Sequence, residues 1–322
     1  MTAAASRVAL VTGANSGIGY EVAKQLAAGP SYRLIILACR DSARAEQARL
    51  ALGRATGRQI FRTLAIDLSS ATSVRAAALS LGDGIDDLVM NAGGGGGPRP
   101  LELTSDGVTN VIASNVLGHA VLLDELLQSA RLRRAAIYVG SEAARGAPAL
   151  RLERPVLADH SVAEFTSICD GSSHASHPPN PAMAYAEAKL IAALWMSALA
   201  RRYPSLKLLT VSPGNTSGTA FMRDFPLPLR LFITYVFMPF IAPRRGLVHD
   251  VHTGASRIVR GLNDPGCVSG SFYASQPDRV TGPLVEQGPL FPELADKEVQ
   301  DNAAAAIERL VRMALRNFAS GK

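Results

Sequence analysis

Short apolar runs alternate with segments of helical spacing along most of this 322-residue chain. Runs rich in Val, Ile and Leu predict buried strands, and apolar residues three and four apart predict helices. The predicted strands are residues 8–11, 34–38, 60–66, 87–90, 135–139, 206–211 and 270–274, and the helices between them include residues 21–28, 42–52, 70–81 and 104–129. Continuous apolar strands separated by helices predict a parallel sheet that is covered on both faces. We therefore expect a single α/β domain over residues 1–322, doubly wound around a seven-stranded parallel sheet.

Two segments break this alternation. Residues 142–184 are polar in places and rich in Pro and His, and residues 221–243 are strongly apolar. Long segments of this kind inside a compact domain are often lids or binding loops. The most apolar part, residues 227–242, contains Arg230 and two prolines, so it is too short and too interrupted for a spanning helix. It is a candidate for a substrate-covering lid, a subunit face or a peripheral contact with a membrane surface.

Composition and charge narrow the class of protein. Hydrophobic residues make up 48% of the chain and charged residues 19%, which excludes bulk disorder. The net charge is +6, but no block of five or more basic residues occurs, so we expect no nucleic-acid partner. Three widely spaced cysteines suggest reduced thiols, and a strand that begins near residue 7 leaves no room for a cleavable leader; both indicate a cytoplasmic protein. The His and Cys residues of 142–184 match no standard metal spacing, so we expect no metal.

A glycine-rich loop follows the first predicted strand and opens the first helix. It reads Thr-Gly-Ala-Asn-Ser-Gly-Ile-Gly over residues 12–19. Gly13 allows a tight turn, Gly17 lets the backbone approach a pyrophosphate, and Gly19 lets the helix pack closely on the sheet. The free N–H groups at the start of a helix attract negative charge. This strand–loop–helix context predicts a Rossmann-type dinucleotide site that also includes Asn15, Ser16 and Ile18.

The spacing Gly-x-x-x-Gly-x-Gly with a preceding Thr resembles the short-chain dehydrogenase/reductase family. Further matches follow in chain order over residues 7–219. They are Asp67-Leu68, Asn91-Ala92-Gly93, Asn115, Ser141, Tyr185-x-x-x-Lys189 and Pro213-Gly214. The resemblance implies an oxidoreductase that uses a nicotinamide cofactor.

The catalytic candidates are Tyr185, Lys189, Ser141 and Asn115. Residues four apart in a helix share one face, so Lys189 lies one turn from Tyr185. A free Tyr has a pKa of about 10, and a nearby ammonium favours the phenolate and lowers that value. Ser141 can donate to the substrate oxygen while Tyr185 transfers the proton. The resemblance implies that Asn115 holds a water that links Lys189 to solvent.

The end of the second predicted strand bears on cofactor choice. It reads Ala-Cys-Arg-Asp over residues 38–41 and lacks the carboxylate that would accept a ribose 2′-OH. Arg40 can instead pair with a 2′-phosphate, which favours NADP(H). The alternative is an exposed Arg40 that is merely balanced by Asp41. The resemblance places Asp67 near the adenine and Asn91 near the adenosine ribose, and it makes Leu68, Ala92 and Gly93 further cofactor-binding candidates. It also places Pro213 and Gly214 beside the nicotinamide; the Thr usual five residues after the Pro is Gly218 here, so Thr216 or Thr219 must serve.

A long insertion separates Ser141 from Tyr185. This insertion, the Arg-Asp after the second strand and Asn-x-x-Gly-His at residues 115–119 resemble the protochlorophyllide reductase and retinol dehydrogenase branch of the family. The expected function is an NADP(H)-dependent carbonyl reductase or alcohol dehydrogenase for a bulky apolar small molecule. Two alternatives are a reductase of a conjugated C=C bond and a non-catalytic NADP(H)-binding sensor. The substrate, the direction, the stereochemistry and the choice between monomer and homo-oligomer stay open.

Overall fold

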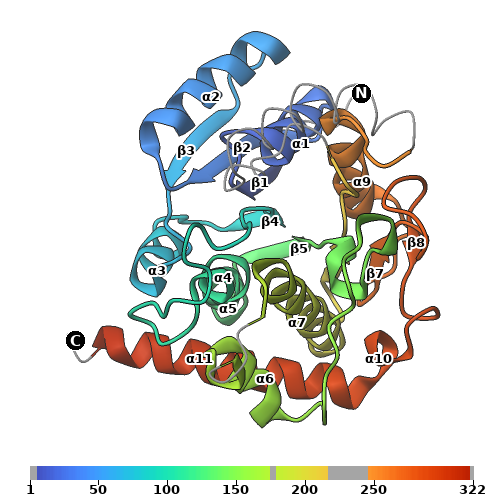
Figure 1. The fold of residues 1–322 in the computed structure, drawn as a ribbon. Helices are drawn as coiled ribbons and strands as arrows, with labels where there is room; N and C mark the ends of the chain where they lie inside the picture. The colour runs from blue at the N-terminus through green and yellow to red at the C-terminus, as the bar shows by residue number, and fades with distance from the viewer. Residues whose placement is uncertain (1–5, 175–178, 217–245, 320–322) are drawn as a thin grey trace.

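One twisted sheet runs through the middle of the molecule in the computed structural model, which describes residues 6–174, 179–216 and 246–319 (Figure 1). Within these residues the strands are β1 (Arg7–Thr12), β2 (Tyr32–Cys39), β3 (Phe61–Ala65), β4 (Ile85–Met90), β5 (Leu132–Val139), β6 (Lys207–Val211), β7 (Phe272–Ala274) and β8 (Val285–Glu286). They form an eight-stranded sheet in the order β3-β2-β1-β4-β5-β6-β7-β8. The first seven pair in parallel, and β8 pairs antiparallel to β7. The predicted doubly wound fold is confirmed, with a two-residue edge strand added.

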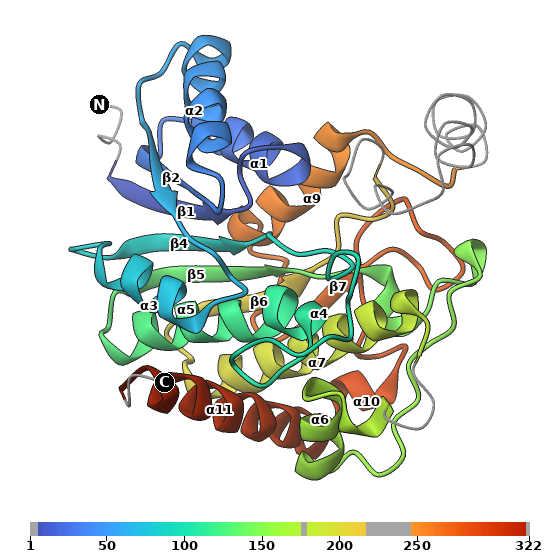
Figure 2. The ribbon, with the colours of Figure 1, turned by 60° about the vertical axis from the view of Figure 1, so that its left-hand side comes forward.

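Helices cover both faces of the sheet (Figure 2). One face carries α1 (Gly17–Ala28), α2 (Ser42–Thr56) and α9 (Val251–Asn263), and the other carries α3 (Ala71–Leu79), α5 (Gly118–Gln128), α7 (Pro181–Arg202) and α11 (Lys297–Ala319). Strand β1 shows why two cores form. Its Ala9 and Val11 pack in the core under α1, α2 and α9, whereas Val8 and Leu10 pack in the core on the other face, because successive side chains of a strand point to opposite faces.

The order of the strands indicates where a ligand would bind. From β1 the chain runs outward to β2 and β3, and it then returns to β4 on the other side of β1. Ligands of open α/β sheets bind outside the carboxyl ends of the strands at such a switch point. Many of the predicted cofactor and catalytic residues, among them Gly13, Asn91 and Ser141, follow the carboxyl ends of these strands and face this crevice.

The expected helix over residues 104–129 begins later than predicted. Gly107 has φ +78°, which is a left-handed conformation, so residues before 110 form a turn. The helical part consists of α4 (Asn110–Ile112), a π-helical turn (Ala113–Leu117) and α5. Asn115 therefore lies in the π-helical turn and not in a regular α-helix.

The insertion 142–184 divides between the cleft and the core. Its first part contains two 3₁₀ turns, Glu142–Arg145 and Pro148–Leu150, which follow β5 directly. Its helix α6 (Val162–Cys169) packs instead against α11 and α7, with Phe165 and Cys169 fully buried. Among the described residues of the insertion, the first part and Ala182 at the start of α7 line the cleft, whereas α6 does not. The other predicted lid, residues 221–243, lies outside the described residues.

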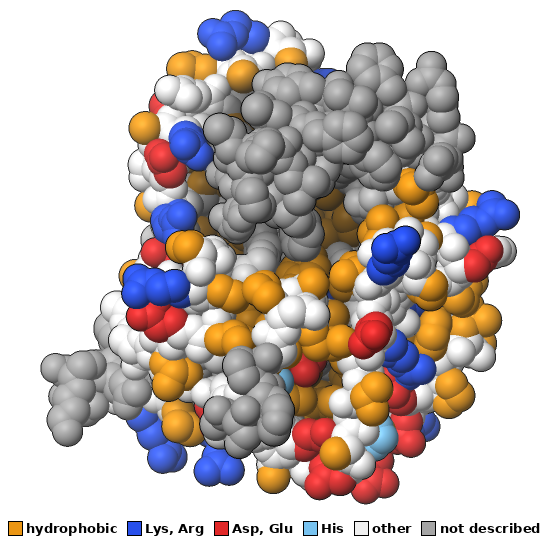
Figure 3. Space-filling model, in the orientation of Figure 1, with side chains coloured by type: hydrophobic (Ala, Val, Ile, Leu, Met, Phe, Trp, Pro, Cys, Tyr) orange, Lys and Arg blue, Asp and Glu red, His pale blue; other side chains and the backbone are white. Residues whose placement is uncertain are grey.

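Two further observations concern apolar surface. Helix α7 is long and apolar enough to cross a bilayer by length and composition, but 78% of its most apolar window is buried inside the protein, as in a core helix. Hydrophobic side chains gather in the middle of the face shown in Figure 3, and acidic side chains lie along its lower edge.

Candidate active site

A single cleft of about 1470 Å³ lies at the carboxyl ends of the central strands. Nearly all the residues predicted for the site line it: Gly13, Asn15, Ser16, Gly17, Ile18, Arg40, Asp67, Leu68, Asn91, Ala92, Gly93, Ser141, Tyr185, Lys189, Pro213, Gly214 and Thr216. The two exceptions, Gly19 and Asn115, are buried and are not among the residues that line the cleft. The structure thus brings the glycine loop and the catalytic candidates into one space.

The glycine loop has the geometry of a phosphate cradle. Gly13 and Gly17 have φ +66° and +57°, and the N–H of Gly13 donates to the carbonyl of Ala38 at 2.8 Å. A Cβ at Gly19 would lie 2.5 Å from the carbonyl oxygen of Gly13, so only glycine fits beneath the loop. A Cβ at Gly17 would meet no atom within 4 Å and would project into open space. Ser16 caps α1 without a side-chain hydrogen bond, so its hydroxyl does not compete for the first N–H groups of the helix. These features fit a bound pyrophosphate.

A matched pair of glycine variants tests this cradle. Gly57, which ends α2, has φ +67° and the same open surroundings as Gly17, but it lies outside the cleft lining. Alanine at either position should lower the free energy of unfolding by about 1–2 kcal/mol, because L-residues disfavour this conformation. Only Gly17→Ala should also weaken NADPH binding, by roughly 10- to 100-fold, since the new methyl group occupies pyrophosphate space. Fluorescence titration with NADPH measures this. Equal NADPH affinity in the two variants would contradict the assignment.

The end of β4 is tied to the end of β1 by a hydrogen-bonded clip. The hydroxyl oxygen of Thr12 accepts from the backbone N–H groups of Asn91 and Ala92, each at 2.9 Å. The Asn91 amide donates to the carbonyl of Thr12 at 2.9 Å. The clip holds both cofactor-facing loops in register. At β3, the Asp67 carboxylate accepts from the N–H and the hydroxyl of Ser69, which shapes the turn that faces the cleft.

Two arginines lie at the β2 end of the cleft. Asp41 caps α2 by accepting from the N–H of Arg44 at 3.0 Å, and its carboxylate also lies 3.4 Å from the Arg44 guanidinium. Asp41 is therefore engaged by Arg44 and not by Arg40. Within the described part of the chain, no hydrogen bond or ion pair engages Arg40, which is exposed at the cleft. Sequence reasoning missed Arg44, although its position one turn after Arg40 could have indicated it.

Tyr185 and Lys189 lie one turn apart on α7, which begins at Pro181 behind an Asn180 cap. Burial raises the pKa of Tyr185 to about 12, and a hydrogen bond with Ser141 opposes this rise. Burial lowers the pKa of Lys189 to about 7. The predicted lowering of the Tyr185 pKa is therefore wrong for this structure. Lys189 directs its ammonium at the Tyr138 hydroxyl (3.1 Å) and the Val139 carbonyl (2.9 Å), and the burial of Tyr185 outweighs the effect of this charge on the Tyr185 pKa.

Asn115 uses its side chain to hold the glycine run that follows β4. Its amide donates to the carbonyl of Gly94 at 2.8 Å, and its carbonyl oxygen accepts from the N–H of Gly94 at 3.2 Å. This explains part of the loop of five glycines: a Cβ at Gly93 would clash with the Asn115 side chain. The backbone carbonyl of Asn115 accepts from the Tyr138 hydroxyl at 2.9 Å. The Tyr138 hydroxyl thus joins Lys189 to the backbone of Asn115.

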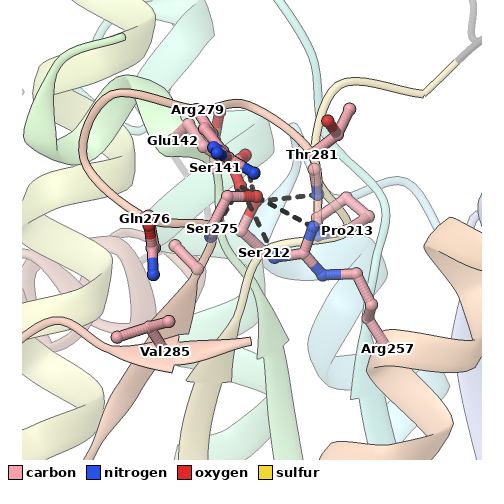
Figure 4. Close-up of polar contacts among 12 residues, drawn as sticks. Ser141, Glu142, Ser212, Pro213, Arg257, Ser275, Gln276, Arg279, Thr281 and Val285 are labelled. Carbon is pink, nitrogen blue, oxygen red and sulfur yellow. Dashed lines mark hydrogen bonds and ion pairs between the residues drawn. The ribbon is translucent and has the colours of Figure 1, made fainter. Parts of the chain in front are cut away.

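A buried network of polar side chains lies beside the site, and two of its members, Glu142 and Ser212, also line the cleft (Figure 4). The Glu142 carboxylate accepts from the N–H and hydroxyl of Ser275 at 3.2 and 3.1 Å and from the hydroxyl of Ser212. It also lies 3.7 Å from the Arg257 guanidinium, and all four residues are buried. The Ser212 hydroxyl oxygen in turn accepts from the N–H of Gly214 at 3.1 Å. The network joins the ends of β5, β6 and β7, and no sequence pattern indicated it.

Two polar residues of the insertion, Cys169 and His174, lie outside the lining of the cleft. Cys169 is fully buried in the core, and burial raises the pKa of its thiol. His174 lies 3.1 Å from Glu187, a carboxyl whose pKa is raised to about 7 by burial. Among the residues that the structure places, no group of three or more His, Cys, Asp or Glu could hold a metal ion.

Comparison with known proteins places these features in context. The family model described as short chain dehydrogenase matches residues 7–150. That span contains the glycine loop, the Asp67 turn and the Asn91 loop, and it ends after Ser141.

Three curated proteins are similar over much of the chain. Retinol dehydrogenase 11 of Homo sapiens is 30% identical, with 76% of this chain and 72% of that protein covered. The chloroplastic protochlorophyllide reductase of Chlamydomonas reinhardtii is 28% identical, with 93% and 75% covered. The WW domain-containing oxidoreductase of Drosophila melanogaster is 33% identical over 68% of this chain, which spans only about half (51%) of that protein. Both enzyme types of the branch predicted from the sequence are thus among the similar proteins.

A solved structure supports the fold. L-sorbose reductase from Gluconobacter frateurii, determined with NADPH and L-sorbose, superimposes with a TM-score of 0.61. The likeness covers 88% of this chain and 100% of the other at 18% sequence identity. At this identity the similarity shows the α/β fold alone.

Proposed function

Because this chain belongs to the short-chain dehydrogenase/reductase family, whose members are NAD(P)-dependent oxidoreductases, we propose that it is an NADP(H)-dependent enzyme that interconverts the carbonyl and the alcohol of a bulky apolar small molecule. The observation that carries the proposal is that one cleft contains Ser141, Tyr185 and Lys189 together with the phosphate cradle of α1. A non-catalytic NADP(H) sensor would not need the first three.

The chemistry that a bound NADP(H) supplies is hydride transfer at a carbon atom. This chain supplies the proton and the orientation. Tyr185 donates its phenolic proton to the oxygen that becomes the alcohol, and it regains a proton from solvent afterwards. The hydroxyl of Ser141, which already bonds Tyr185, holds the same oxygen. The Lys189 ammonium, one turn along α7, stabilises the phenolate that remains on Tyr185.

The preference for NADP(H) rests on the two arginines at the end of β2. Arg40 is exposed at the cleft, and Arg44 lies one turn beyond it with Asp41 as its partner. Two guanidinium groups suit a 2′-phosphate and give no advantage to a ribose 2′-OH. The fold relative L-sorbose reductase was solved with NADPH, in line with this choice.

The preference for an apolar substrate rests on the wall next to Tyr185. That wall is built from small and aliphatic side chains, namely Ala143, Ala147, Leu150, Leu152 and Ala182. Leu150 is 36% exposed, so it offers apolar surface to a ligand that enters the cleft. Alanines leave room for a bulky molecule. The name of the human relative, retinol dehydrogenase 11, is consistent with such a substrate.

An NADPH-oxidation screen tests the proposal against its alternatives. NADPH consumption at 340 nm is followed with bulky apolar aldehydes and ketones, with conjugated enones, and with small water-soluble carbonyls as a comparison. We expect turnover with the first group and the highest kcat/KM for its most apolar members. The similarity to protochlorophyllide reductase makes C=C reduction the second candidate, which the enones would reveal. NADPH binding without turnover on any compound would favour a sensor and contradict the proposal.

A further inference from the structure

The ammonium of Lys189 ends a chain of buried hydrogen bonds that the proposed reaction does not yet use. Its Nζ atom lies 3.1 Å from the Tyr138 hydroxyl, which lies 2.9 Å from the backbone carbonyl of Asn115. A carbonyl can only accept, so the Tyr138 proton points at Asn115. The remaining lone pairs of the Tyr138 oxygen are therefore available to the Lys189 ammonium. The contacts fix the direction of both hydrogen bonds.

We propose that Tyr138 is a positioning residue for the proton transfer at Tyr185, because its hydroxyl holds the catalytic ammonium of Lys189 in its charged form and in one place. The proposal rests on the function proposed above. It adds a residue from β5 to a site that already contains Tyr185 and Lys189 on α7 and Ser141 after β5.

Because Lys189 is buried, its charge depends on the hydrogen bond to the Tyr138 hydroxyl. Tyr138 and Asn115 are 0% exposed, and Lys189 is 3% exposed. A buried ammonium needs hydrogen-bond acceptors to remain charged. The contacts of Lys189 within the described residues give it two, the Tyr138 oxygen and the Val139 carbonyl at 2.9 Å. Loss of the first would leave one acceptor for a charge that burial already disfavours.

The carbonyl of Asn115 is held from a second side. His119 Nδ1 lies 3.3 Å from it, and His119 Nε2 lies 3.0 Å from the Thr12 hydroxyl. Burial and the charge of Lys189 lower the pKa of His119 to about 3, so the ring is neutral and adds no competing charge. With the proton on Nδ1, His119 donates to Asn115 and accepts from Thr12. The acceptor that orients Tyr138 is thus fixed by the clip between β1 and β4.

Among the residues that the structure describes, four titratable groups lie near Lys189 or act on its neighbour Tyr185. Tyr138 on β5 has its ring centroid 4.6 Å from Nζ, and Tyr185 on α7 has its centroid at 5.6 Å. His119 on α5 is neutral, and Glu142 after β5 acts on Tyr185. Phenylalanine at position 138 keeps the aromatic ring beside the ammonium and removes only the hydroxyl.

The test is a ¹³C NMR titration of Lys189 in protein labelled at the lysine Cε atoms, with no cofactor or substrate added. Five lysines occur in the chain, and the Lys189 signal is assigned with Lys189→Met. We expect the Lys189 midpoint to fall by about one pH unit in Tyr138→Phe. Tyr32→Phe is the matched control, since it loses an equally buried hydroxyl, bonded to Asp87 at 2.7 Å, at the remote end of β2. Its Lys189 midpoint should equal that of the wild type.

A second readout connects this shift to the reaction. With NADPH and the best compound of the screen, the fall of kcat at high pH should move to lower pH by the same amount in Tyr138→Phe, because the ammonium is lost earlier. Thermal unfolding curves of both Phe variants show whether each variant is folded at the temperature of the titration. An unchanged Lys189 midpoint would overturn the proposal even if the enzyme proved to have another substrate. A shifted midpoint with an unshifted kcat profile would overturn the role in the reaction.

Discussion

Replacement of Tyr185 by phenylalanine should lower kcat by roughly 10²- to 10⁴-fold and leave the fold and NADPH binding intact. The substitution removes the proton donor, whereas the ring that packs on α7 remains. The hydride donor and the Ser141 hydroxyl are both retained, so residual turnover reflects binding and orientation alone. The measurement is the steady-state rate of NADPH oxidation, with NADPH affinity determined by fluorescence.

Tyr203→Phe provides the matched control, since Tyr203 ends the same helix away from the cleft. It should retain wild-type turnover. If Tyr185→Phe turned over as fast as this control, another group would be the proton donor, and the assignment of the site would fail.

Loss of both Arg40 and Arg44 should remove the preference for NADPH over NADH. A hydrogen bond to a charged group contributes about 1.5–3 kcal/mol, so the double alanine variant should bind NADPH roughly 10- to 100-fold more weakly. Affinity for NADH should change little, because it lacks the 2′-phosphate. Titration with both cofactors at one salt concentration measures the difference.

Arg54→Ala is the control for a general loss of positive charge, because Arg54 is exposed near the end of α2 and outside the cleft. It should leave both affinities nearly unchanged. An equal weakening of NADPH and NADH in the double variant would show that the arginines do not contact the 2′-phosphate, and the cofactor proposal would then be wrong.

The periodicity of apolar residues was sufficient to predict the sheet. Strands β1 to β6 are five to eight residues long, and all of them except the edge-side strand β3 contain four or five consecutive buried residues. Such runs carry a strong signal. Strand β8 has two residues, Val285–Glu286, and is held by pairing with β7, so no local pattern marks it. The π-helical turn at Asn115 is likewise set by contacts with Tyr138 and Gly94, which are distant in the sequence.

Some residues of the site could be predicted from the sequence, and others are recognised only from contacts in the folded protein. Gly13, Gly17 and the Tyr185–Lys189 pair stand at short fixed spacings, so a single chain reveals them. Glu142 reaches Ser212, Arg257 and Ser275 only after β5, β6 and β7 are side by side. Tyr138 looks like any apolar strand residue until its hydroxyl is found beside Lys189. The spacing of residues along the sequence does not reveal polar partners that are distant in the chain. These partners influence the charge states on which the proposed chemistry depends.

The central claim, hydride transfer to a carbonyl carbon, is tested most directly by following the label from NADPH that carries deuterium at both C4 positions of the nicotinamide. All-trans-retinal suits the experiment, because this bulky apolar molecule presents an aldehyde and conjugated C=C bonds to the same cleft. After turnover, mass spectrometry and NMR of the product locate the deuterium. The account predicts one deuterium on the carbinol carbon of retinol and none elsewhere. Deuterium on a carbon of a reduced C=C bond with the aldehyde intact, or bound NADPH that is never consumed, would contradict it.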